Sequence, residues 1–133
     1  MTHISRKKLP PQIEKDIRSA LKSVFINLSR SDVDKIINFL ITETEQLMMA
    51  KRLTCVLMLM EGATYKEISK SLNLTEQTIT GINFEINKSP REYKYLSSKL
   101  TPWKRKQLFK SILKELGLHS LKMIAKHSGG RIY

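Results

Sequence analysis

Residues 64–87, TYKEISKSLNLTEQTITGINFEIN, decide how the fold of this chain is predicted. Thr64 followed three positions later by Glu67 is a capping box, which predicts that a helix begins here. Asn73 can adopt the left-handed conformation that ends a helix, and Thr75 is a good N-cap for the next one. The stretch therefore predicts two short helices joined by a tight turn.

The second of these helices has an apolar face and a polar face. Ile79, Ile82 and Ile86 recur at a spacing that places them on one side, which we expect to face the core. In a helix-turn-helix, the N-terminal half of the second helix reaches base edges in the DNA major groove. An ordinary helical hairpin has similar caps and stripes, but the small Ser69, the turn and the basic chain favour DNA binding. The polar or small residues in that half, on other faces, are Glu76, Gln77, Thr80 and Gly81.

The positive charge of the chain is concentrated after this motif. The 133 residues include 24 lysines and arginines and 12 aspartates and glutamates, which gives a formal net charge of +12. Residues 1–87 carry a net charge of +2, whereas residues 88–133 carry 12 basic and two acidic side chains, a net charge of +10. Such a one-sided basic segment favours a polyanionic partner, nucleic acid first and an anionic membrane second, over a solubilising role.

The composition argues against several other classes of protein. No apolar run approaches the ~20 residues that span a membrane, and residues 1–11 lack the apolar core of a signal peptide. Cys55 is the only cysteine, the histidines lie far apart, and no glycine-rich phosphate loop occurs. We therefore expect a cytoplasmic, nucleoid-associated protein without a membrane partner, and no enzyme activity, catalytic residue, cofactor or metal.

The whole sequence predicts an all-α fold. Apolar residues recur at helical spacings, and no segment shows the alternation of a strand. Ser31 with Asp34 is expected to cap the second helix, and Thr42 with Glu45 the third. The predicted helices cover approximately residues 11–28, 31–40, 42–61, 64–73, 75–87, 89–99, 101–117 and 118–127.

We expect four segments along the chain. They are a flexible N-terminus over residues 1–10, a helical DNA-binding domain over 11–98 with its helix-turn-helix at 64–87, a basic helical extension over 99–127, and a disordered tail over 128–133.

The third predicted helix is unusually apolar. Its stretch LMMAKRLTCVLMLM, residues 47–60, is interrupted only by Lys51, Arg52 and Thr54. A helix that is apolar almost all round is normally buried from several sides, and a chain of 133 residues has little protein to surround it. An interlocked homodimer would bury this helix, with the first helix as a packing partner and the four methionines of the stretch as core filler.

Five features of residues 41–90 belong together: Thr42 at the start of the long helix, K-R-L at 51–53, E-G at 61–62, Y-K-E-I at 65–68 and T-I-T at 78–80. In these features the segment resembles the core of the Trp repressor superfamily. The resemblance implies an all-helical, intertwined homodimer that regulates transcription by binding specific sequences in double-stranded DNA. The two motifs of such a dimer read half-sites about one helical turn, ~34 Å, apart, and Trp repressor is itself a known example of this docking.

The resemblance also implies which residues meet DNA, from the first motif helix and the start of the second. Lys66 suits a phosphate contact, and Gln77 is of a type that pairs with adenine in the major groove. Glu76 is better explained by its favourable place at a helix N-terminus. The complete expected DNA-binding set is Tyr65, Lys66, Thr75, Glu76, Gln77, Thr78, Thr80 and Gly81.

A possible effector pocket is implied around Thr42 and Arg52. In the tryptophan-sensing members, the ligand is held between an arginine of the long helix and one that follows T-I-T. Arg52 matches the first arginine, but Gly81 occupies the position of the second. The resemblance therefore implies that tryptophan is not the effector, and it leaves the effector unknown.

The segment after the motif is expected to form a docked helix with a cationic surface. Leu108, Ile112, Leu113 and Leu116 give this helix an apolar stripe. Trp103 either stacks on a base or packs at the helix start, and packing is favoured. The cations expected to bind phosphates of flanking DNA are Lys104, Arg105, Lys106 and Lys110.

Two other functions fit the same sequence. One is an RNA-binding or architectural nucleic-acid-binding protein that uses the basic C-terminal segment, with the helical core serving dimerisation. The other is an adaptor that docks on a larger replication or transcription complex through its apolar C-terminal helices.

Overall fold

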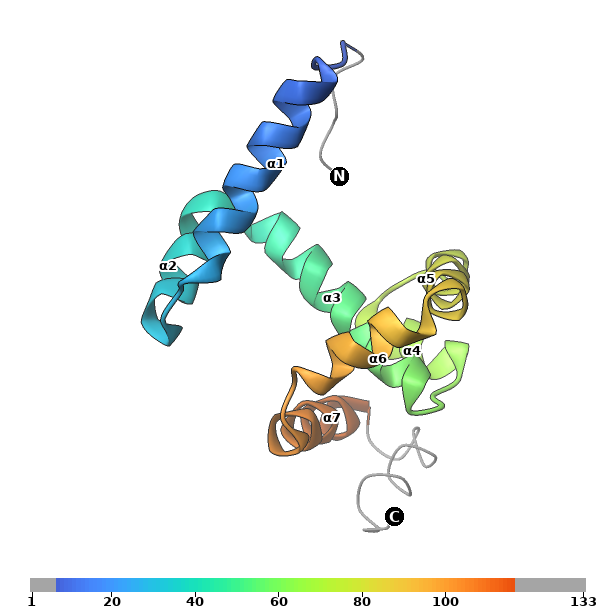
Figure 1. The fold of residues 1–133 in the computed structure, drawn as a ribbon. Helices are drawn as coiled ribbons and strands as arrows, with labels where there is room; N and C mark the ends of the chain where they lie inside the picture. The colour runs from blue at the N-terminus through green and yellow to red at the C-terminus, as the bar shows by residue number, and fades with distance from the viewer. Residues whose placement is uncertain (1–6, 117–133) are drawn as a thin grey trace. The chain divides into compact units, whose positions relative to one another are not determined.

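The computed structural model describes residues 7–116, which form seven α-helices and, over that range, no strand (Figure 1). This confirms the predicted all-α class. The helix predicted over residues 118–127 and the tail predicted over 128–133 lie outside the described residues, as do residues 1–6. The helices are α1 (Pro11–Ile26), α2 (Arg30–Leu40), α3 (Glu43–Met60), α4 (Tyr65–Leu72), α5 (Glu76–Lys88), α6 (Pro90–Ser98) and α7 (Pro102–Leu116).

The described residues divide into two units, 7–49 and 50–116, and the boundary falls within α3. In the first unit, Pro11 opens α1 at a position where its missing N–H is not needed. No residue of this unit is buried, so it has no core of its own within one chain. The predicted apolar face of α1 is present, but it is 43–52% exposed at each of Ile13, Ile17, Leu21 and Val24.

The capping box that opens α2 lies two residues before the predicted one. The Ser29 hydroxyl accepts a hydrogen bond from the backbone N–H of Asp32 at 3.3 Å, and the Asp32 carboxylate accepts one from the backbone N–H of Ser29, also at 3.3 Å. The predicted pair, Ser31 and Asp34, is therefore wrong. It has the same spacing as the observed pair, so a spacing rule does not distinguish them.

Both ends of α3 follow local sequence rules. The Thr42 hydroxyl accepts from the backbone N–H of Glu45 at 3.1 Å, and the Glu45 carboxylate accepts from the backbone N–H of Thr42 at 3.0 Å. This confirms the predicted capping box. After the helix, Gly62 has a φ of 86° and donates its N–H to the Leu59 carbonyl at 3.0 Å. Glycine adopts this left-handed conformation at little cost, so α3 ends here.

The apolar stretch of α3 is buried along only part of its length. Residues 54–58 are buried, whereas Leu47, Met48 and Met49 are 45–59% exposed. Within one chain, the prediction that the methionines fill the core is therefore correct only for Met58.

The second unit has one core, to which α3, α4, α5 and α7 contribute. The predicted stripe of α7 packs against it through Leu108, Ile112 and Leu113, and Phe109 is fully buried. Helix α7 is thus docked, as expected, and it packs in the same unit as the helix-turn-helix. The buried apolar residues of this core are Cys55, Val56, Leu57, Met58, Ala63, Ile68, Ile79, Ile82 and Phe109.

Candidate nucleic-acid interface

Helices α4 and α5 form the predicted helix-turn-helix, and both caps are where the sequence places them. The Thr64 hydroxyl accepts from the backbone N–H of Glu67 at 3.1 Å, and the Glu67 carboxylate accepts from the backbone N–H of Thr64 at 2.7 Å. At the start of α5, the Thr75 hydroxyl accepts from the backbone N–H of Thr78 at 3.2 Å. Each cap satisfies an N–H that the first turn of a helix otherwise leaves unpaired.

The turn between the two helices is held by its backbone and by one side-chain hydrogen bond. Asn73 has φ 54° and ψ 50°, the left-handed conformation predicted for it. The Ser69 hydroxyl donates to the Leu74 carbonyl at 2.7 Å, which ties α4 to the chain beyond the turn. The sequence indicates only that Ser69 is small, because the acceptor comes within reach only once the turn has formed.

Buried isoleucines join α4 to α5. Ile68 and Ile79 are fully buried and Ile82 is nearly so, while Ile86 is partly buried. The predicted core face of α5 is therefore confirmed, and the opposite face of this helix is left for solvent or a ligand.

The polar face of the N-terminal half of α5 is exposed. Among the described residues, neither Lys66 nor Gln77 has a hydrogen-bond or ion-pair partner, so their polar groups are available to a ligand. Tyr65 differs from the rest of the predicted DNA-binding set, because its side chain is partly buried against the core. The exposed members of the set are Lys66, Thr75, Glu76, Gln77, Thr78, Thr80 and Gly81.

Three threonines of this surface are engaged within the chain. The Thr78 hydroxyl lies 2.9 Å from that of Thr75, and the Thr80 hydroxyl donates to the Glu76 carbonyl at 2.9 Å. A hydroxyl that donates one hydrogen bond can still accept others, so these side chains remain able to accept hydrogen bonds from a ligand.

Gly81 stands on α5 with open space beside it. A Cβ built at this position has nothing within 4 Å. Packing within the chain therefore does not require glycine, which costs a helix interior about 1 kcal/mol relative to alanine. The bare backbone leaves room for a ligand to approach closely.

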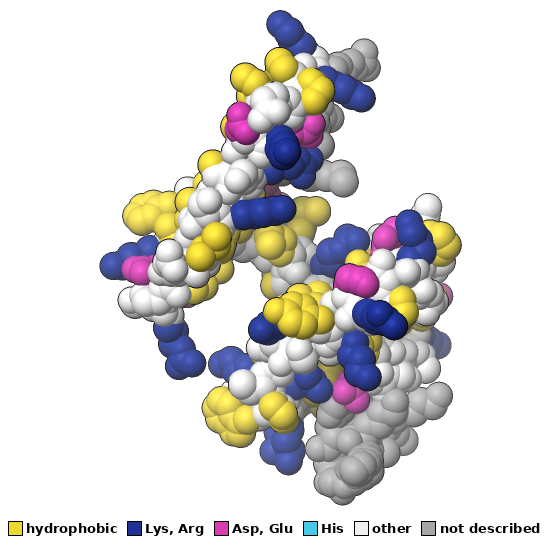
Figure 2. All heavy atoms as spheres, viewed as in Figure 1, with side chains coloured by type: hydrophobic (Ala, Val, Ile, Leu, Met, Phe, Trp, Pro, Cys, Tyr) yellow, Lys and Arg dark blue, Asp and Glu magenta, His cyan; other side chains and the backbone are white. Residues whose placement is uncertain are grey.

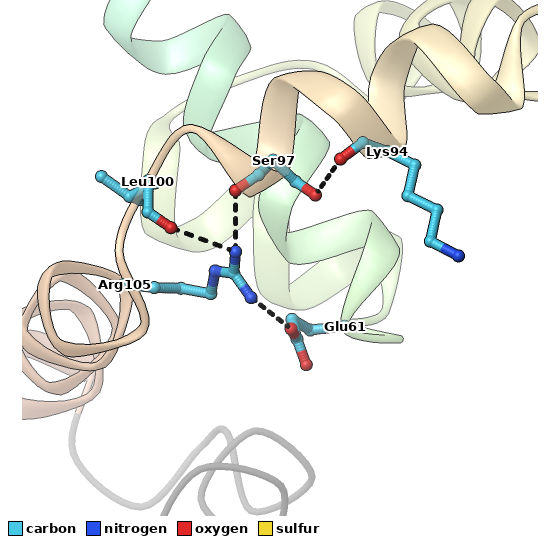
Figure 3. Close-up of polar contacts among 5 residues, drawn as sticks. All are labelled: Glu61, Lys94, Ser97, Leu100 and Arg105. Carbon is cyan, nitrogen blue, oxygen red and sulfur yellow. Dashed lines mark hydrogen bonds and ion pairs between the residues drawn. The ribbon is translucent and has the colours of Figure 1, made fainter.

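The predicted phosphate-binding residues of α7 divide into three exposed lysines and one partly buried arginine. Arg105 Nη2 donates to the Ser97 carbonyl at 2.7 Å and to the Leu100 carbonyl at 3.3 Å, and its Nη1 lies 3.9 Å from the Glu61 carboxylate (Figure 3). Arg105 thus braces the connection between α6 and α7, and its phosphate-binding role stays a prediction. The exposed lysines are Lys104, Lys106 and Lys110.

Trp103 is 66% exposed, so the favoured prediction that it packs at the start of α7 is wrong. The periodicity of the helix gives the reason: Trp103 points to a different side of α7 from Phe109 and Ile112, which pack on the core.

The C-terminal part of the second unit is strongly basic. Residues 88–116 contain nine basic and two acidic side chains, a net charge of +7. Figure 2 shows dark blue Lys and Arg side chains spread over the viewed face of α5, α6 and α7, with hydrophobic side chains between them. Such a surface attracts polyanions.

The predicted effector residues belong to different units. Thr42 lies in the first unit, where its hydroxyl caps α3, and Arg52 is an exposed side chain of the second. A groove of about 620 Å³ occurs within the second unit, and its lining includes Leu53, Leu100 and Lys104. Periodicity does not predict this groove, because it is formed by α3 and α7, which are far apart in sequence.

The single cysteine is unreactive at neutral pH. Cys55 is buried, and burial raises the pKa of its thiol from 9.0 to about 11, although the positive charge of Arg52 acts in the opposite direction. The thiolate is the reactive form of cysteine, so little of it is present.

Residues 7–116 contain no group of three or more His, Cys, Asp or Glu side chains placed to hold a metal ion. No helix in this range combines the length and hydropathy needed to cross a membrane. The three histidines, His3, His119 and His127, lie outside the described residues.

Comparison with known proteins points to the same motif. A family model, described as Trp repressor protein, matches residues 16–101, about two thirds of the chain. The matched range contains the whole of α4 and α5 and stops just before α7. No curated protein and no solved structure matches the chain. Because the family model covers well over half of its residues, the chain belongs to the Trp repressor family of DNA-binding helix-turn-helix regulators, which is not a family of enzymes.

Proposed function

We propose that the chain is a transcriptional regulator that binds specific sequences in double-stranded DNA as a homodimer, with α5 in the major groove. The observation that carries the proposal is the exposed N-terminal half of α5, held on α4 by buried isoleucines and by the Ser69 hydrogen bond. A regulator of this kind acts in the cytoplasm, on the nucleoid.

The proposed contacts divide into base readout and phosphate binding. Gln77 is the base reader, because its amide is exposed without a partner in the described chain and matches the donor and acceptor of adenine. Lys66 binds a phosphate beside it. Glu76 stabilises the start of α5 through the helix dipole. The remaining contacts come from Thr75, Thr78, Thr80, the backbone at Gly81 and the exposed part of Tyr65.

The exposed lysines of α7 extend the phosphate contacts onto flanking DNA. Lys104, Lys106 and Lys110 are all exposed, and α7 is anchored to the motif by Phe109. Each phosphate that they neutralise releases counterions and makes binding more sensitive to salt.

The homodimer is supported by the unburied apolar faces of residues 7–49. A contiguous apolar face on a surface is typical of an interaction site, and a second copy presents the same face in a two-fold arrangement. Two motifs related in this way read half-sites ~34 Å apart.

We also propose that DNA binding does not depend on tryptophan. Gly81 provides no side chain to hold a ligand, and Thr42 is already used as a helix cap. Addition of tryptophan is therefore expected to leave the measured DNA affinity unchanged.

Selection from a randomised duplex DNA library at two salt concentrations tests the proposal. The expected result is enrichment of a palindromic motif with half-sites about one turn apart. Salt-sensitive binding without an enriched motif would contradict sequence-specific recognition, and would indicate an architectural role for the basic surface of α6 and α7.

Two variants then test the contacts on the selected site. Gln77→Ala should cost about 1–3 kcal/mol of binding free energy and relax the preference at one base position. Lys66→Ala should weaken binding to all sequences equally and reduce the salt slope by about 1. Gln107→Ala and Lys15→Ala are matched controls, because both side chains are exposed on other helices. Unchanged sequence specificity in Gln77→Ala would contradict the proposal that Gln77 reads a base.

A further inference from the structure

Two exposed aromatic side chains flank the connection between α6 and α7, and each has a lysine beside its ring. Tyr95 is 63% exposed and Trp103 is 66% exposed. Lys99 Nζ lies 4.8 Å from the centre of the Tyr95 ring, and Lys104 Nζ lies 6.0 Å from the Trp103 ring. In each pair the positive charge lies over a ring that is largely exposed.

The connection between the two pairs is held in place. Arg105 donates to the carbonyls of Ser97 and Leu100, which lie between Tyr95 and Trp103 in the sequence (Figure 3). Phe109 anchors α7 in the core about one turn after Arg105. The two rings are thus carried by an ordered framework, which lowers the entropy lost when they bind a ligand.

The surroundings of the rings select a polyanion. Residues 88–116 have a net charge of +7, and Lys104 also lines the groove beside Leu53 and Leu100. Phosphates of duplex DNA could bind the lysines, but duplex DNA offers the rings nothing to stack on. The faces of its paired bases are covered by the neighbouring base pairs. An exposed ring instead fits an unpaired base, on which it can stack.

We propose that the α6–α7 connection binds unpaired nucleotides, with Tyr95 and Trp103 stacking on bases and Lys99 and Lys104 neutralising phosphates. Aromatic platforms along a cationic track are the chemistry of single-strand binding. The surface uses neither α4 nor the N-terminal half of α5, and Lys104 is the only residue that it shares with the proposed duplex contacts. It therefore provides an activity beyond duplex recognition: a strand opened or transcribed beside the regulator can be held by the same chain.

An anionic membrane is the competing polyanion, and the packing of α7 argues against it. A helix that lies in a membrane surface inserts a continuous apolar face. The apolar face of α7 is used inside the protein, where Phe109 is buried and Leu108, Ile112 and Leu113 are partly buried.

The test uses the fluorescence of Trp103, which is the only tryptophan of the chain. The full-length protein is titrated with a thymidine dodecamer, a uridine dodecamer and an abasic deoxyribose strand with the same number of phosphates. The thymidine and uridine dodecamers are both single-stranded. The one that binds more tightly identifies single-stranded DNA or single-stranded RNA as the preferred ligand. The expected result is quenching by at least one of them, with the abasic strand bound about tenfold more weakly.

Variants at Tyr95 separate stacking from charge. Tyr95→Ala should weaken binding of a labelled dodecamer about tenfold, as measured by fluorescence anisotropy, whereas Tyr95→Phe keeps the ring and should bind like the wild-type protein. Circular dichroism of both variants is expected to match that of the wild type, because Tyr95 is exposed.

Three results would overturn the inference: equal affinity for the abasic and base-bearing strands, unchanged Trp103 fluorescence at saturation, or quenching by phosphatidylglycerol vesicles and not by strands. Failure of the proposed duplex binding can be distinguished from failure of this inference, because different variants test them. Gln77→Ala should leave single-strand binding unchanged, and Tyr95→Ala should leave affinity for the selected duplex unchanged.

Discussion

Residues 7–49 and residues 50–116 are both helical and both carry apolar faces, but only the second range buries them. Its core closes around Leu57, Ile68 and Phe109, which are almost completely removed from solvent. In the first range, the stripe of α1 is about half exposed, and no residue is buried. Helical periodicity thus identifies an apolar face equally well in both ranges, but it does not tell whether the same chain covers that face.

Charging the face of α1 is expected to have the largest effect. The double variant Ile17→Glu with Leu21→Glu should raise the dissociation constant of the proposed dimer by at least about a hundredfold, because unpaired carboxylates would be buried at the interface. Sedimentation equilibrium measures this constant. Ser19→Glu is the matched control, since Ser19 lies on the opposite side of α1. A double variant that sediments like the wild type would show that this face is not the interface.

Truncation of the anchor of α7 should come next. Phe109→Ala removes a fully buried ring and should lower the free energy of unfolding of the second unit by about 3–5 kcal/mol. Urea unfolding followed by circular dichroism measures this loss. Trp103→Ala removes an exposed ring from the same helix and should change stability by less than about 0.5 kcal/mol. Equal losses in the two variants would contradict the docking of α7.

The same cap occurs in both units and permits a direct comparison. Ser29→Ala and Thr64→Ala each remove the hydroxyl of a capping box and should each cost about 1 kcal/mol. If the first unit folds only against a second copy, the melting temperature of the transition that Ser29→Ala lowers should rise with protein concentration, whereas that of the transition lowered by Thr64→Ala should not. Thermal unfolding at two concentrations, about a hundredfold apart, distinguishes them. Concentration-independent melting temperatures in both variants would mean that residues 7–49 fold without a partner.

The smallest expected effect is on how the stability of the second unit depends on pH. Burial raises the pKa of Cys55 from 9.0 to about 11. Below pH 9 the thiol is protonated in both states, so it does not affect stability there. Between pH 9 and pH 11 the unfolded chain releases this proton first, so stability should fall as the pH rises. Urea unfolding over this range should show a weaker pH dependence for Cys55→Ala than for the wild type; parallel curves would rule out a contribution from this thiol.

Local rules predict most helix ends, because a cap involves residues three positions apart. Thr42 with Glu45 and Thr64 with Glu67 are found as predicted. Ser29 is the exception, since two overlapping pairs have the same spacing and only the path of the chain after α1 selects one of them.

Side-chain burial is less predictable, as the two aromatic residues of α7 show. Trp103 and Phe109 are each followed by a lysine, and yet one is exposed and the other is fully buried. Arg105 likewise stands between two lysines and alone turns toward the chain. The docking of α7 on α3 and α4 decides these orientations, and it depends on residues far away in the sequence. The choice of DNA-contacting residues stays a prediction, since it depends on a ligand as well.

The open space beside Gly81 has a consequence for the evolution of this regulator. A glycine codon becomes an arginine codon by a single base change, and the first carbon of a new side chain would meet no atom of its own chain. Most replacements would also favour the helix over glycine. The fold therefore keeps a position on the exposed face of α5 where a new side chain can appear in one mutational step without repacking the core.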